Sequence, residues 1–275
     1  MINTVSGGNS FANISAFVTS NGRILQKSLV NFAAGQRIMN PSNGLGDYFA
    51  GKSFNFQARG LEHARRELFQ AKSILDLAQE SIAMIFGDLN DILDLTQEYF
   101  SSNNSNNADI KKHLRNKISE IQSLVIQTRD NTVFGGRKLL EDSSANPLID
   151  MNINPNGNGS DRFVISFGAD MVVDMSNFNL DKGEDFAIGE IREQINRASK
   201  FMGTLAGFQR GVEAQISINE ITSSNLTDAA GNVLGLDDMD EIFALTKRQI
   251  QQQAAVSMLS QGNMMRGSVL NLVKN

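Results

Sequence analysis

The sequence contains no cysteine, and this absence excludes several classes of site at once. A disulfide framework, a thiolate nucleophile, a zinc finger and an iron–sulfur cluster all require cysteine. Histidine is nearly as scarce, because only His63 and His113 are present, fifty residues apart. Imidazole catalysis and histidine metal sites are therefore disfavoured. We expect no enzyme activity, no bound metal and no cofactor.

Long apolar runs and clustered positive charge are also missing. No window holds about 18 consecutive apolar residues, and no cationic start precedes an apolar run, so neither a membrane span nor a cleaved secretory signal is predicted. Residues 1–46 contain no acidic side chain, but residues 1–40 hold only three cations, too sparse for a nucleic-acid surface. The net charge of the chain is −5. Residues 1–40 and 241–275 each carry a net charge of +3, so residues 41–240 carry −11. We expect neither membrane insertion nor nucleic-acid binding.

Helical periodicity is the strongest positive signal. From Leu61 to Tyr99, small and apolar residues recur in steps of three and four, which makes a heptad seam of 39 residues. At about 1.5 Å per residue this helix is ~58 Å long, much longer than a typical globular helix, and a coiled coil is favoured. Similar stripes cover residues 110–128, with Asp109 as the expected cap, and residues 188–216, in a helix from about Glu184. The three helices can pack on each other.

The segments between these helices have a different composition. Residues 101–107 are polar turn formers and predict a loop. Asn156-Gly157-Asn158-Gly159 predicts a β-turn, and the strand-like runs Arg162–Phe167 and Met171–Met175 follow it. We therefore expect one small β-hairpin element within about residues 133–183. Asp228–Gly235 is expected to be a looser linker before the final helix.

Each end of the chain carries one apolar stripe at helical spacing, interrupted by Asn21 in the first and by Gln261 in the second. Each stripe is too short and too one-sided to be stable alone, so we expect the two to pack on each other and on neighbouring molecules. The candidate assembly residues are Ile14, Val18, Leu25, Leu29, Phe32, Ile250, Met258, Met265, Val269, Leu270 and Leu272.

These patterns predict a mainly α fold, namely an elongated antiparallel helical bundle or coiled coil with a small β-hairpin element. Residues 1–43 and 240–275 are expected to form an inner coiled-coil domain of terminal helices. Residues 44–239 are expected to form an outer helical domain that includes the β-hairpin element. An apolar surface at the termini favours self-assembly.

Several stretches resemble bacterial flagellin along nearly the whole chain. The C-terminal end contains Gln251–Ala254, Met258–Asn263 and Val269–Val273, which resemble the closing pattern of the family. Gly35–Asn40 is similar to the family's Gly-x-Arg-Ile-Asn stretch, with Met39 as an extra residue. Phe134–Leu140 is similar to the Phe-Asn-Gly-x-x-Leu-Leu segment, with Gly in place of Asn.

The resemblance implies a helical polymer, the hollow filament of a bacterial flagellum used for motility, formed by this chain alone or with other flagellins. It also implies unprocessed export through the flagellar type III apparatus, with an export chaperone on the C-terminal end. Cap and hook-junction proteins are further implied partners. An extracellular filament and a periplasmic one both fit this resemblance.

Two alternatives to a filament subunit stay open. A hook–filament junction protein shares the terminal helices, although the glutamine-rich stretch and the Val-Leu-x-Leu ending favour flagellin. A secreted, non-polymerising coiled-coil effector or adhesin is the alternative from a different class. A Toll-like receptor of the innate immune system recognises many flagellins through an arginine, and Asp91 stands at the corresponding position here. This difference argues against recognition by that receptor.

Overall fold

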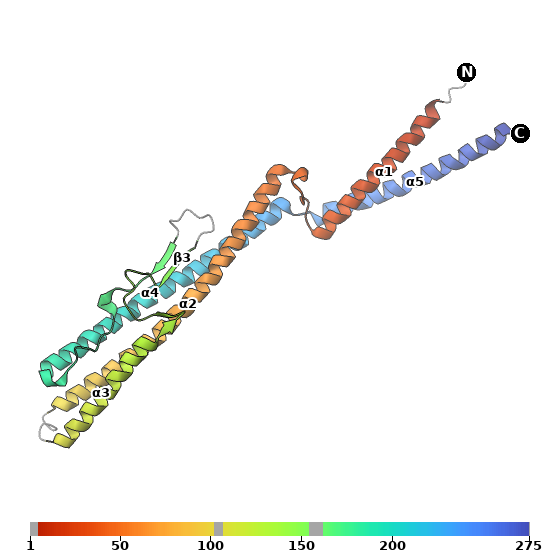
Figure 1. Cartoon of the computed structure of the whole chain (residues 1–275). Helices are drawn as coiled ribbons and strands as arrows, with labels where there is room; N and C mark the ends of the chain where they lie inside the picture. Colours follow the sequence, from red (N-terminus) through yellow and green to blue (C-terminus); the bar gives the residue numbers. More distant parts are fainter. Residues whose placement is uncertain (1–4, 102–106, 154–161, 275) are drawn as a thin grey trace. The chain divides into compact units, whose positions relative to one another are not determined.

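A computed structural model describes residues 5–101, 107–153 and 162–274, and it is mainly helical (Figure 1). The predicted fold class is confirmed. Within the described residues, five α-helices account for most of the chain: α1 (Val5–Ala34), α2 (Leu45–Phe100), α3 (Ala108–Asn131), α4 (Glu184–Leu234) and α5 (Asp238–Lys274). Three short 3-10 helices lie between them: η1 (Pro41–Asn43), η2 (Ala169–Met171) and η3 (Leu180–Lys182).

The chain divides into two compact units. One unit contains Met1–Phe56 and Leu226–Asn275, and the other contains Gln57–Asn225. The first unit therefore holds α1, α5, the beginning of α2 and the end of α4. The second holds the rest of α2 and α4 together with α3 and the strands.

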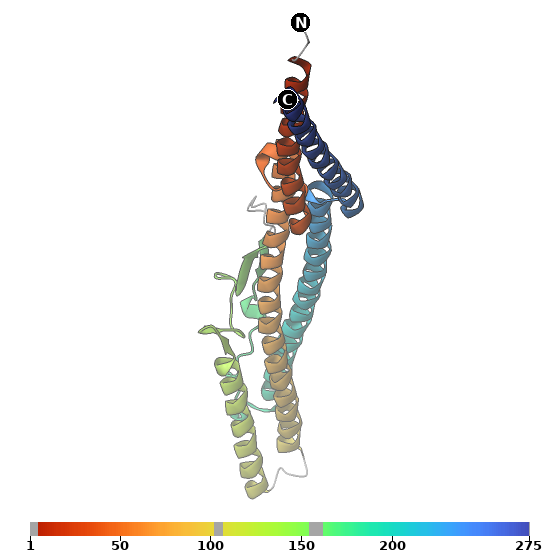
Figure 2. The same ribbon diagram turned by 90° about the vertical axis from the view of Figure 1, so that its right-hand side faces the viewer.

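The seam of α2 forms the centre of the unit that contains residues 57–225. Every residue predicted for this seam from Leu61 to Tyr99 is buried, including the polar Thr96. Figures 1 and 2 show α2, α3 and α4 side by side, and their buried faces form one apolar cluster. Burial of each Leu or Ile side chain contributes about 1.5–3 kcal/mol, so this long seam is the main source of stability in the unit.

The start of α2 lies sixteen residues before the predicted one. The periodicity did not reveal this first part because its large apolar side chains Leu45, Phe49 and Phe56 are exposed. The C-terminal end of α4 also differs from prediction. Residues 228–234, expected to be a looser linker, continue the helix to Leu234, and only Gly235–Asp237 separate it from α5.

The start of α3 corrects the predicted cap. Asn107 is the N-cap residue, and its side-chain oxygen accepts a hydrogen bond from the backbone N–H of Ile110 at 3.3 Å. Asp109 lies instead in the first turn, where its negative charge is favoured by the helix dipole. Asparagine and aspartate are both good caps, so the sequence pattern alone did not distinguish them.

Two small antiparallel hairpins are present where one was expected. In the first, β1 (Val133–Phe134) pairs with β2 (Arg137–Lys138) across Gly135 and Gly136, whose φ angles of +58° and +80° favour glycine. In the second, β3 (Ile149–Asn152) pairs with β4 (Arg162–Ile165), and Ile149 is opposite Ile165. The turn predicted at residues 156–159 lies outside the described residues.

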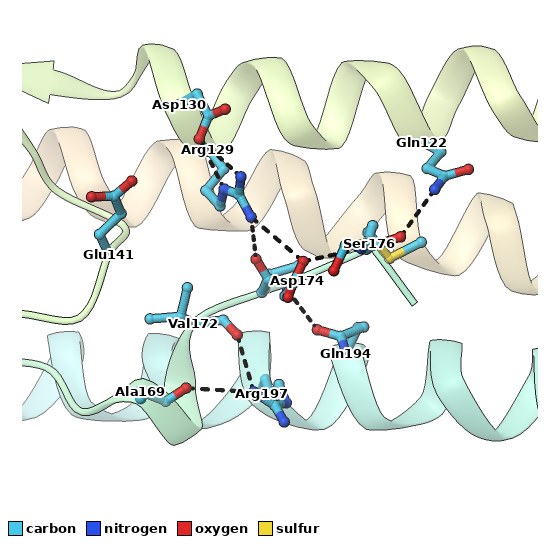
Figure 3. A network of polar contacts seen from close by, with 12 residues as sticks. Gln122, Arg129, Asp130, Glu141, Ala169, Val172, Asp174, Ser176, Gln194 and Arg197 are labelled. Carbon is cyan, nitrogen blue, oxygen red and sulfur yellow. Dashed lines mark hydrogen bonds and ion pairs between the residues drawn. The ribbon is translucent and has the colours of Figure 1, made fainter. Parts of the chain in front are cut away.

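Residues 171–175, predicted as a strand, do not pair with any described strand. Met171 is the last residue of η2, the backbone continues through residues 172–175 without regular secondary structure, and the side chains of Val173 and Met175 enter the apolar core. Side chains of α3 satisfy the backbone carbonyls of these same two residues, because Arg129 Nη1 donates to Val173 at 3.1 Å and Gln122 Nε2 donates to Met175 at 3.0 Å (Figure 3). A strand partner is therefore not needed to satisfy this backbone.

The same segment is held from the other side by α4. Gln194 Oε1 accepts a hydrogen bond from the Asp174 backbone N–H at 2.8 Å, and Arg197 Nη1 donates to the Val172 carbonyl at 3.4 Å (Figure 3). The backbone N–H of Ser176 donates to the Asp174 carboxylate, which lowers the pKa of Asp174. Residues 169–176 are thus fixed between α3 and α4 by side chains of both helices.

In the first unit, the end of α1 is a Schellman motif. Gly35 has a φ of +62°, its N–H donates to Phe32 O, and the Gln36 N–H donates to Asn31 O, each at 3.1 Å. The next residues reach the end of α4, because the Arg37 N–H donates to the Leu234 carbonyl at 2.9 Å. The break that follows α1 therefore lies beside the break that follows α4.

Candidate assembly surface

The helices α1 and α5 pack as an antiparallel pair, with the start of α1 and the end of α5 at the same end of the pair (Figure 1). On α1, the predicted residues Ile14, Val18 and Leu25 are partly buried. On the described part of α5, Leu245 and Ala255 are the buried apolar residues. The apolar contact between the two helices is consequently thin.

A buried polar link lies in the middle of this thin contact. Asn21 is only 3% exposed, and its Nδ2 donates to the Arg248 carbonyl at 2.9 Å and to Gln252 Oε1 at 3.0 Å. Gln252 Nε2 in turn donates to the Val18 carbonyl at 3.2 Å. An asparagine within an apolar seam fixes the register of two helices, since any shift leaves its amide without partners.

In the sequence, Asn21 interrupts the apolar stripe of α1, and the stripe alone does not reveal this role. A signal was nevertheless available, because Val18, Asn21 and Leu25 follow one another in steps of three and four. A polar residue in phase with a stripe indicates a partner across the seam, whereas one out of phase indicates solvent. No comparable signal identified Gln252, which belongs to a run of three glutamines.

Most of the other candidate assembly residues are not buried between α1 and α5. Leu29, Phe32, Ile250, Met258 and Met265 are exposed, and Ile250 is 60% exposed. The backbone of α5 extends to Lys274, but the side chains of Val269, Leu270 and Leu272 lie outside the described part of the chain.

Further large apolar side chains are exposed on the same two helices, and they enlarge the apolar surface of the pair. They are Phe17, Ile24 and Val30 on α1 and Met239, Ile242, Phe243, Val256 and Met264 on α5. An apolar groove runs between the helices and is lined by Asn13, Ile14, Phe17, Gln251, Ala254, Ala255 and Met258. Exposed apolar surface of this extent is typical of a surface that binds another protein.

Several carboxylates lie at the start of α5 and stabilise the first turn of this helix. Asp237 Oδ1 accepts hydrogen bonds from the backbone N–H groups of Met239 at 3.1 Å and Asp240 at 3.2 Å. Asp238 and Glu241 lie in the first turn, where the helix dipole favours negative charge. These contacts account for the acidic cluster.

The histidines lie in exposed positions. His63 Nδ1 lies 3.3 Å from Glu67 Oε1, one turn further along α2, and His113 is exposed on α3. Within residues 5–101, 107–153 and 162–274, no three acidic or histidine side chains gather in a way that could hold a metal ion. No helix in the described part of the chain combines the length and the apolar character that a membrane span requires.

Comparisons with known proteins agree with the geometry of the terminal helices. Residues 188–273 match the model of the bacterial flagellin C-terminal helical region. The chain is 23% identical to a flagellin of Bacillus subtilis over 94% of this chain and 95% of that protein. It is 24% identical to a flagellin of Halalkalibacterium halodurans over 90% of this chain and 92% of that protein.

A third relative is longer than this chain. A flagellin of Aquifex pyrophilus is 22% identical over 46% of this chain, and the match covers only 25% of that protein. The full-length matches to the two shorter relatives and the C-terminal family match point to the same family. They confirm the predicted resemblance to bacterial flagellins, at low identity, over nearly the whole chain.

Proposed function

We propose that the chain is a structural subunit that polymerises into the helical filament of a bacterial flagellum and so serves motility. The likeness to flagellins over nearly the whole chain supports this function. The observation that carries the assembly step is the exposed apolar surface of the α1–α5 pair. Flagellins are structural proteins, so no catalytic role is part of the proposal.

The partner that best fits this surface is another copy of the same chain. Both helices present apolar side chains outward, and the contact between them buries few of these side chains. Burial of each exposed Leu, Ile, Phe or Met side chain in a neighbour's surface contributes about 1.5–3 kcal/mol. Repeated copies supply identical apolar surfaces, as a homopolymer requires.

The proposed functional division follows the charge of the chain. Residues 1–43 and 240–275 form the inner assembly domain. Residues 44–239, which include the β-hairpin element within about residues 133–183, form the outer domain. Residues 41–240 carry −11, and like charges repeated along a filament are tolerated best where water and salt screen them. The basic, apolar ends then lie inside.

The further proposed partners follow from the resemblance to flagellins. We include an export chaperone on the C-terminal end, the filament cap and the hook-junction proteins, together with other flagellins as copolymer subunits. The filament is extracellular, outside the cell that exports its subunits. The surface of α5 is the part that a chaperone would need to cover before assembly, because its apolar side chains are exposed.

Electron microscopy of the purified chain at rising concentration tests the proposal directly. Filaments with a defined helical repeat are expected. A chain that stays monomeric at every concentration, with its helices intact by circular dichroism, would contradict the assembly function and favour a non-polymerising coiled-coil protein.

A matched pair of variants tests the surface itself. Ile250→Asp places an unpaired charge in the proposed contact and is expected to abolish filaments, because burying such a charge costs several kcal/mol. Ile250→Leu keeps the volume and the apolar character and should leave filaments unchanged. Since Ile250 is exposed in the free chain, the helical content of both variants should equal that of the parent.

A further inference from the structure

The exposed thioethers of the chain are concentrated on α5. The chain has eleven methionines and no cysteine, so methionine supplies all of its sulfur. Met239, Met258, Met264 and Met265 are exposed on α5, whereas Met84 is the exposed methionine elsewhere in the described residues. Met264 and Met265 are each 69% exposed.

Three of these side chains lie in the C-terminal half of α5, and the first of them, Met258, lies beside α1. Met258 lines the groove with Ile14 and Phe17, and Met265 follows it by seven residues, so both lie on the same side of the helix. Met264 is next to Met265 in the chain. Met239 lies in the first turn, far along the helix from this group.

Exposed thioethers are the groups in such a chain that oxidants attack. The sulfur lone pair attacks one oxygen of hydrogen peroxide, an S–O bond forms and the O–O bond breaks. Sulfur loses two electrons and becomes a sulfoxide, while the peroxide is reduced to water. The product is a polar, chiral side chain in place of a flexible apolar one.

We infer that Met258, Met264 and Met265 form an oxidative modification site through which peroxides block assembly of the free subunit. This inference rests on the proposed function, because it assumes that the exposed face of α5 is buried between subunits. A sulfoxide oxygen in that contact needs a hydrogen-bond donor that apolar neighbours do not supply. Inside a finished filament the same thioethers are covered, so the switch acts before assembly.

The reverse reaction makes the modification a reversible one. A methionine sulfoxide reductase uses a dithiol, which is oxidised to a disulfide while the sulfoxide oxygen leaves as water and the thioether returns. Oxidised subunits are therefore recoverable and do not need to be degraded.

The first experiment exposes the monomeric chain to hydrogen peroxide and maps sulfoxides by peptide mass spectrometry. The critical concentration for filament growth should rise by at least about tenfold, since one unmet polar group costs roughly that factor. Treatment with dithiothreitol and the two methionine sulfoxide reductases, one for each sulfoxide epimer, should restore the original critical concentration. Sulfoxides at all three positions with an unchanged critical concentration would overturn the inference.

Variants assign the effect to the site. The triple variant Met258→Leu, Met264→Leu, Met265→Leu should assemble normally and be less sensitive to peroxide than the parent, whereas Met84→Leu should remain as sensitive as the parent. A triple variant as sensitive as the parent would remove these residues from the mechanism.

A second measurement uses the parent chain alone, in case the triple variant does not assemble. Partly oxidised subunits are allowed to polymerise, and the pellet and supernatant are mapped separately. Sulfoxides at the three positions should be depleted from the pellet, and the sulfoxide at Met84 should not. Equal occupancy in both fractions would refute the inference, whereas failure of unoxidised subunits to polymerise would refute the proposed function instead.

Discussion

Replacement of Asn21 tests the idea that a single buried amide holds α1 and α5 together. In Asn21→Ala the two hydrogen bonds from Nδ2 are lost, at 2.9 Å to the Arg248 carbonyl and at 3.0 Å to Gln252 Oε1. The Arg248 carbonyl lies inside α5 and keeps its helical partner, and Gln252 is only partly buried and can turn to water. Neither acceptor is left without a partner, so each bond contributes about 1 kcal/mol and the loss is about 2 kcal/mol.

Hydrogen exchange of the monomer measures this loss. About 2 kcal/mol corresponds to a roughly thirtyfold faster opening of the pair, because 1.4 kcal/mol is a factor of ten. We expect this acceleration in amides of α1 and α5, and no change in the part of α2 between Leu68 and Ile92. Ser20→Ala, at the exposed neighbouring position, is the matched control. Unchanged exchange in Asn21→Ala would refute the role of the link.

Asn21→Leu separates stability from register. An apolar side chain in the seam keeps or raises the stability of the pair but removes the penalty for sliding. A shift by one heptad moves the helices by about 10 Å. Because the chain has no native cysteine, spin labels on Asn13→Cys and Ser257→Cys report this distance without background labelling. A single sharp distance in the Leu variant would show that the asparagine does not set the register.

Two further predictions concern packing and pH. Gly51→Ala should destabilise the chain by about 1–3 kcal/mol in urea unfolding, because the added Cβ would lie 2.3 Å from Leu234 Cγ. Gly46→Ala has open space around its added Cβ and should stabilise the chain slightly. Equal effects of the two substitutions would contradict this packing. Hydrogen bonds from Arg115 lower the pKa of Asp181, so this pair adds stability above the ordinary pKa of an aspartate and loses it as pH falls through the lowered value. Arg115→Gln should raise the NMR titration midpoint of Asp181, and an unmoved midpoint would refute the assignment.

The sequence was most informative where one physical rule acts alone. The α2 seam was predictable because burial on one helical face produces a period that can be read directly, and all of its members are buried from Leu61 to Tyr99. The first part of α2 was not predictable by this rule, since Leu45 and Phe49 point to solvent. Apolar periodicity detects only the part of a helix that is covered by its own chain.

The failed predictions arose where side chains and backbone compete for the same role. Residues 171–175 have the composition of a strand, but Arg129 and Gln194 from two helices supply the hydrogen bonds that a strand partner would give. Such long-range pairs leave no local pattern. In the candidate site, the apolar members followed from spacing, whereas Asn21 required knowledge of the residue opposite to it.

The way residues 169–176 are held has a consequence for a chain that is proposed to assemble with many copies of itself. Backbone that runs extended with free N–H and C=O groups invites another chain to add a strand, which leads to aggregation. Here the carbonyls of Val172, Val173 and Met175 are occupied by arginine and glutamine side chains of the same molecule. The neighbouring hairpin is short, and the ion pair between Arg162 and Asp150 places charge on it. This backbone is thus closed to strand addition when subunits are concentrated, which leaves the exposed helical surface of α1 and α5 for the proposed assembly.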